Sequence, residues 1–129
     1  MPVPEIWLKS AIEEATDLLA YPLVVPEGAA LPWIVYGRNA TQRDLVLGGV
    51  SNVPMGTFDV AVYADSYADA KGYADEIRAA VNNFNGTVGD LTIEAVMLTD
   101  ERDGDPVFFD GRDVPTYAVQ QTYTIRWQE

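Results

Sequence analysis

The sequence predicts an α+β domain in which two helices pack on one face of a four-stranded, largely antiparallel sheet. Two segments, 5–20 and 67–84, carry apolar residues at helical spacing. Two others, 57–64 and 117–127, alternate apolar and polar residues, which is typical of strands with one buried face. Both helical stripes need an apolar surface to cover, and one face of a sheet provides it. At 129 residues, we expect a single domain over 1–129.

The first quarter of the chain contains the first predicted helix. Pro4 stands where a first turn tolerates proline, and Pro22 ends the helical pattern. Residues 23–25 are expected to be briefly extended, 26–28 to turn, and 33–38 to form a strand that is apolar on both faces. The helical stripe consists of Leu8, Ala11, Ile12, Ala15, Leu18 and Leu19.

The strand over 57–64 leads directly into the second predicted helix. Ser66 with Asp69 three residues later resembles a capping box in which Asp replaces Glu. Asn85 and Gly86 suit a left-handed cap at the other end. The stripe expected to face the sheet consists of Ala70, Ala74, Ile77, Val81 and Phe84.

Two further strands and two long connections complete the predicted order. The third strand is expected over 91–98 and the fourth over 117–127, where the period of two is clearest. Residues 40–56 and 99–116 connect these elements.

The composition excludes several function classes. The chain has no histidine and no cysteine, so a Ser-His-Asp or Cys-His arrangement is impossible within it. The net charge is −12, and the eight basic residues are scattered, so we expect no specific binding of nucleic acid. The sequence shows neither a signal peptide nor an apolar run of about 18 residues, and we expect no membrane contact. We therefore expect no enzyme activity, no metal and no cofactor.

The connection 99–116 is rich in carboxylates. Its acids do not have the spacing of a calcium-binding EF-hand loop, and nothing places two of them across a sugar site. We interpret it as a solvated, mobile acidic loop available for contact with a partner. The acids concerned are Asp100, Glu101, Asp103, Asp105, Asp110 and Asp113.

The connection 40–56 is unusually apolar for a loop. It also fits a projecting hairpin with a two-glycine turn at Gly48 and Gly49. An isolated hairpin is marginally stable in water, so it needs either the subunit's own sheet or a neighbouring subunit to pack on. Both options stay open, and the second makes this segment the candidate interface with a subunit or a tube. The candidate residues are Leu45, Val46, Leu47, Val50, Val53 and Met55.

The unit GTFDVAVYADSYADAKGYADEIRAAVNNFNG at 56–86 resembles the middle of the tail-terminator, or tail-completion, proteins of long-tailed bacteriophages. The resemblance extends over 5–127, through the segment 26–36 upstream and the closing strand downstream. It implies a ring, a hexamer as in that family, that caps the tail tube, ends tail growth and provides the head-attachment surface. It also implies a tail-tube protein and a head–tail connector as partners, DNA that passes through unbound, and assembly in the host cytoplasm into the tail-neck region of the virion.

Three other functions compete with this hypothesis. A head-completion or neck adaptor protein of a phage would bind head vertices instead of tail tubes. A small ligand-binding α+β domain of a bacterium would be a stable monomer or dimer with a pocket. A carboxylate- and metal-dependent enzyme would contain metal after purification.

Overall fold

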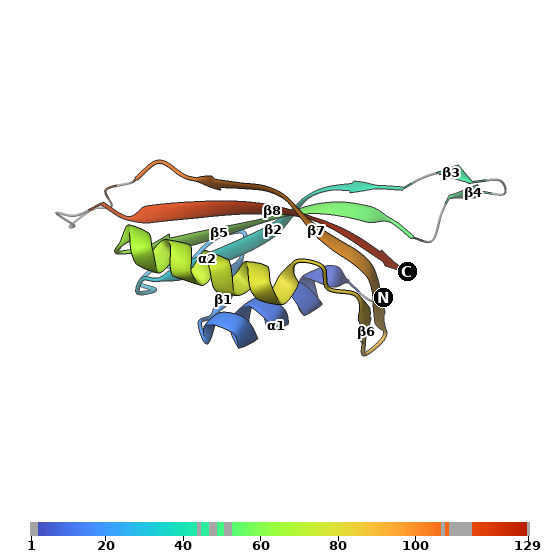
Figure 1. Cartoon of the computed structure of the whole chain (residues 1–129), viewed down its shortest axis with the longest axis horizontal. Coiled ribbons are helices and arrows are strands. Elements are labelled where there is room, and N and C mark those ends of the chain that lie inside the picture. The colour runs from blue at the N-terminus through green and yellow to red at the C-terminus, as the bar shows by residue number, and fades with distance from the viewer. Residues whose placement is uncertain are drawn as a thin grey trace.

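The computed structural model describes residues 3–43, 45–46, 49–50, 53–106, 108 and 115–128. Two helices and eight strands lie along this part of the chain (Figure 1). In chain order they are α1 (Pro4–Thr16), β1 (Ala20–Pro22), β2 (Trp33–Gln42), β3 (Leu45–Val46), β4 (Gly49–Val50), β5 (Met55–Ala64), α2 (Tyr67–Val81), β6 (Gly86–Val88), β7 (Leu91–Asp103) and β8 (Tyr117–Gln128).

The main sheet has six strands in the order β1-β2-β5-β8-β7-β6, and β3 and β4 form a separate two-stranded sheet. β1 pairs with β2 in parallel, and the other neighbours in the main sheet are antiparallel. The predicted fold was therefore wrong: the sheet is six-stranded, mixed and curled, not four-stranded and largely antiparallel (Figure 1).

The prediction failed because the two outermost strands are only three residues long. Three residues are too few to show an alternating pattern. β1 also falls where the sequence predicts the end of the first helix and a proline, and β6 begins at the glycine that was expected to cap the second helix.

The first helix ends at Thr16, four residues before the predicted end. The hydroxyl of Thr16 donates to the carbonyl of Ile12 at 2.8 Å, and Asp17 takes the left-handed conformation with φ of 60°. The amide of Ala20 then donates to the Glu13 carboxylate at 3.0 Å. These bonds turn the chain out of the helix and into β1.

The second helix begins as predicted and ends early. The Ser66 hydroxyl accepts from the Asp69 amide at 3.0 Å, so the predicted cap is confirmed. After Val81, Asn82 is extended and Asn83 is left-handed with φ of 67°. The expected cap at Asn85 and Gly86 was wrong, because the chain leaves the helix three residues before Asn85 and then forms β6.

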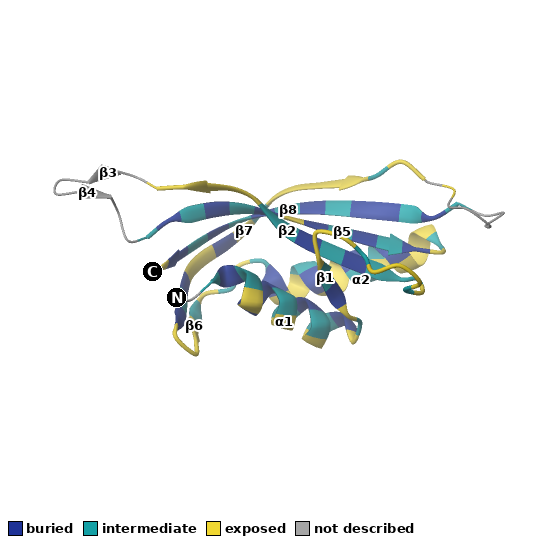
Figure 2. Ribbon diagram, turned by 180° about the vertical axis from the view of Figure 1, so that it is seen from behind, coloured by how far each residue is buried: buried dark blue, intermediate teal, exposed yellow. Residues whose placement is uncertain are grey.

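The core lies between the two helices and one face of the sheet (Figure 2). The α2 stripe is buried as predicted at Ala70, Ala74, Ile77 and Val81. The indole of Trp7 on α1 stacks on Phe84 after α2, with ring centroids 4.8 Å apart. The largest fully buried side chains from the sheet are Trp127, Tyr123, Phe58, Ile34, Ile93 and Ile125.

The subunit is elongated along its strands (Figure 1). β2 and β5 extend toward one end, where β3 and β4 lie, and β7 and β8 extend toward the other. β8 lies between β5 and β7 and pairs with both along nearly all of its length.

Candidate assembly surfaces

The hairpin arm comprises β3, β4 and the adjoining ends of β2 and β5, and contains the predicted interface residues. Leu45 pairs with Val50 and Val46 with Gly49, as in the hairpin alternative, at one end of the molecule beyond the main sheet (Figure 1). Leu47 lies outside the described residues. The interface role of Leu45, Val46, Leu47, Val50, Val53 and Met55 stays a prediction; Val53 and Met55 are half-buried.

An arginine anchors the base of the hairpin arm to the core. The Arg38 guanidinium carbon lies 4.9 Å from the Trp127 ring centroid and 5.2 Å from that of Phe58. The same guanidinium pairs with Glu5 at the start of α1. A Cβ at Gly56 would lie 2.8 Å from the Phe58 ring, so glycine is what lets the two aromatic rings pack here. The arm therefore leaves the sheet from a packed base.

The acidic segment is partly a strand. β7 continues to Asp103, five residues beyond the predicted end, because its residues 100–103 pair with residues 119–122 of β8. Asp100, Glu101 and Asp103 belong to this strand and Asp105 follows it, whereas Asp110 and Asp113 lie outside the described residues. The contact role of these acids stays a prediction.

Three acids near the end of this strand each lie beside a basic group. Asp100 lies 3.3 Å from Arg102, Glu101 3.2 Å from Arg78, and Asp103 2.6 Å from Lys71. Within the described ranges, no group of three or more acidic side chains is arranged to hold a metal ion. Glu101 and Asp103 thus attach β7 to α2, whereas Asp100 pairs within β7.

The second arm comprises the C-terminal end of β7 and the N-terminal end of β8. The Lys71–Asp103 pair belongs to a small cluster at the base of this arm. Tyr67 donates its hydroxyl to Asp103 at 2.7 Å, and the Lys71 ammonium lies 5.3 Å from the Tyr67 ring centroid. Tyr67 also meets Tyr117 edge to face. Hydrogen bonds from Lys71 and Tyr67 lower the pKa of Asp103, and the bond to Asp103 raises the pKa of Lys71.

A buried polar network links α2 to the sheet. The Gln121 side-chain amide donates to the Ala74 carbonyl at 2.9 Å and to Glu101 at 2.6 Å. The Tyr123 hydroxyl donates to the Gln121 oxygen at 2.8 Å, and burial raises the pKa of Tyr123. Gln121 occupies the same strand face as Val119 and Tyr123, and its place in that alternation is the one sequence signal of its burial.

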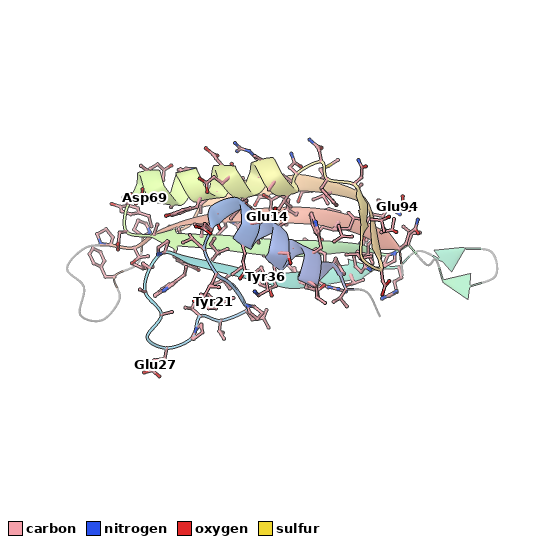
Figure 3. All side chains as sticks on the ribbon, turned by 90° about the horizontal axis from the view of Figure 1, so that it is seen from below. Glu14, Tyr21, Glu27, Tyr36, Asp69 and Glu94 are labelled. Carbon is pink, nitrogen blue, oxygen red and sulfur yellow. The ribbon has the colours of Figure 1, made fainter. Side chains whose placement is uncertain are left out.

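The sheet face away from the helices carries hydrogen-bonded polar and charged residues at its centre. Asp59 there accepts from Asn39 and from Thr122, at 3.1 and 2.9 Å. Arg102 donates to Gln120 in the row that also contains Ala61 and Val35. On the helix side, Glu14 on α1 and Asp69 at the start of α2 are exposed (Figure 3).

An apolar groove of about 430 Å³ lies between the start of α1 and the turn from β6 to β7. Ile6 and Val88, on its two sides, are exposed by 68% and 47%.

No helix in the described part of the chain has the length and apolar character to cross a membrane.

A family model described as "Tail completion protein gp17" matches residues 10–126. The chain belongs to this family. It is thus a structural tail-completion protein of a phage-type virion, acting in the tail region. One solved structure with the same fold is a chain of the "Virion of native gene transfer agent (GTA) particle", with a TM-score of 0.68 and 12% identity, covering 92% of this chain and 84% of that one. The comparison with curated proteins found no significant match.

Proposed function

We propose that this tail-completion protein assembles into a head-to-tail ring of six copies on the end of the tail tube. The ring ends tail growth and presents its other side to the head–tail connector. The observation that carries the proposal is the presence of two different arms at opposite ends of one subunit (Figure 1). A closed ring needs two different, complementary patches on every subunit, and the presence of two different arms supports such a ring.

The proposed mechanism is binding and capping, without catalysis. The chain lacks histidine and cysteine, and Asp100, Glu101 and Asp103 are each paired with a basic group. Six subunits of charge −12 give 6 × −12 = −72, which repels DNA phosphates and favours passage of the genome without adhesion.

The experiment is light scattering of the purified protein with and without tail tubes, combined with negative-stain images. A hexamer of 14.2 kDa subunits has a mass of 6 × 14.2 ≈ 85 kDa. We expect salt to favour the ring, because salt screens the repulsion between acidic subunits. Tubes incubated with the protein should carry a ring at one end and stop growing.

Two outcomes contradict the proposal. Protein that stays monomeric at every salt and protein concentration, even with tubes, is not a ring-forming terminator. Protein that ignores tubes and binds head vertices is a neck adaptor.

A further inference from the structure

Among the described residues, two stretches of the main sheet have a free edge, one on β2 and one on β7, because the outermost strands β1 and β6 are too short to cover them. β1 pairs with β2 only through Ile34–Tyr36, and the Leu23 amide extends that edge by one bond to the Tyr36 carbonyl. In the part of the chain that the structure describes, no strand lies beside residues 37–42 on that side. Unpaired edge groups of this kind accept an added strand.

The second free edge is on β7, at the opposite side of the sheet. β6 covers only Leu91–Ile93, and the end of α2 covers the next positions. The Asn83 amide donates to the Val96 carbonyl at 3.0 Å, and the Asn82 side chain accepts from the Leu98 amide at 2.9 Å. Among the described residues, no strand lies beside residues 99–103 on that side.

The two free edges match in length. Residues 37–42 and 99–103 are close to the usual strand length of about five or six residues. They lie at opposite ends of the molecule, and most of their residues are exposed (Figure 2).

The charges of the two edges decide which pairing is favoured. The β7 edge carries Asp100, Glu101 and Asp103 beside one cation, Arg102, so it is acidic overall, and two such edges would repel each other. The β2 edge contains no acid: it carries Asn39, Thr41 and Gln42, and Arg38 near its start is paired with Glu5. An acidic strand therefore meets a strand without acids.

We infer that residues 37–42 of one subunit pair as a β-strand with residues 99–103 of the next. The occupant of each edge is thus a second copy of this chain, and the sheet continues from subunit to subunit. This inference rests on the proposed ring, and it identifies the two complementary patches as backbone edges. Backbone hydrogen bonds then supply much of the contact, as in other cases of strand addition.

The absence of cysteine from the chain makes disulfide trapping a direct test. Thr41→Cys is combined in turn with Thr99→Cys, Asp100→Cys and Arg102→Cys, and the assembled protein is oxidised. We expect a ladder of linked subunits for at least one pair and none for the singly substituted proteins. The matched control combines Glu27→Cys with Glu76→Cys, both exposed and outside the two edges, and should give no ladder.

The outcomes separate the inference from the proposed function. Rings that form and cap tubes but give no ladder with any edge pair overturn the edge pairing and leave the ring function standing. Dimers linked by Thr41→Cys alone mean two-fold pairing of β2 edges and also overturn it. Protein that never assembles overturns both.

A charge test covers the case in which the cysteine variants fold poorly. Gln42→Glu keeps the shape of an exposed side chain and adds an acid opposite the acidic edge. We expect the concentration for half-assembly to rise about tenfold at low salt and less at high salt. Adding Asp100→Asn should restore part of the loss. Unchanged assembly of Gln42→Glu at low salt overturns the inference.

Discussion

The guanidinium of Arg38 on β2 lies over the indole of Trp127 at the far end of β8, with 4.9 Å between the guanidinium carbon and the ring centroid. This contact joins the start of the hairpin arm to the last strand of the sheet. Arg38 also pairs with Glu5, so one side chain connects α1, β2 and β8.

Replacing Arg38 by methionine should destabilise the subunit by about 1–2 kcal/mol. Methionine keeps much of the aliphatic stem but removes the cation over the Trp127 and Phe58 rings. The free energy of unfolding in urea measures the effect. The control is Arg102→Met, whose side chain is 68% exposed and which should change stability by no more than about 0.5 kcal/mol. Equal effects of the two substitutions would mean that the aromatic contact contributes nothing.

Ile77→Asp should prevent folding of the subunit. Ile77 is fully buried on the α2 stripe, and a carboxylate there loses its water without gaining a partner. The expected cost of several kcal/mol is comparable to the whole stability of a domain this size. Circular dichroism and thermal melting test it, with Ile77→Val as the conservative control at a cost of about 1 kcal/mol. A variant Ile77→Asp that melts like the native protein would show that the stripe is not core.

Gln121→Met should cost about 1–3 kcal/mol even though methionine has a similar size. The change leaves the Tyr123 hydroxyl and the Ala74 carbonyl without their buried partner. Gln120→Met, on the half-buried opposite face of the same strand, is the control and should be nearly neutral. Chemical denaturation of both variants gives the comparison. If Gln121→Met is the more stable of the two, the network serves no stabilising role.

The Lys71–Asp103 pair predicts a defined pH dependence. The pKa of Asp103 is lowered in the folded state, so its contribution is present above the unfolded pKa and is lost as the pH falls through the folded value. The pKa of Lys71 is raised, so its contribution is lost only as the pH rises through the folded value, above 10.5. The difference in melting temperature between the native protein and Asp103→Asn should therefore be largest near neutral pH and vanish in strong acid. A difference that stays constant from neutral pH to about pH 2 would contradict the pairing.

Changing Leu45 and Leu47 together to serine should leave the subunit folded and abolish ring formation or tail capping. The reason is that β3 and β4 lie beyond the main sheet, and the apolar residues of this hairpin are predicted to contact a neighbouring subunit or a tube. Circular dichroism checks the fold, and light scattering with tail tubes checks assembly. Unfolding of the double variant would assign the two leucines to the subunit's own core. Normal capping of tail tubes by the double variant would show that the arm is not part of the interface.

The strand-to-helix unit could be predicted because its signals are local. The Ser66 hydroxyl caps the helix by accepting from the amide of Asp69, only three residues later. The α2 stripe repeats every three or four residues. β8 was predictable for the same reason, since its alternation needs no partner to be visible.

The elements that were missed depend on partners far away in sequence. Residues 100–103 are all charged and look like a loop, yet they form a strand because β8 pairs with them. Likewise Gln121 is polar in the sequence but buried, because the Ala74 carbonyl and Glu101 satisfy its amide. For the candidate sites, the apolar and acidic segments were visible from composition, whereas the free edges required the strand order.

The central position of β8 has a mechanical consequence. One arm leaves from β2 and β5 and the other from β7 and β8. Tension between neighbouring subunits in the proposed ring would therefore pass from β5 to β8 within each subunit. These strands are paired from Met55 to Ala64, and a pull along them loads their hydrogen bonds in shear. In that geometry many bonds must break at once instead of one after another. In the proposed ring, this geometry would oppose stretching as a genome passes through.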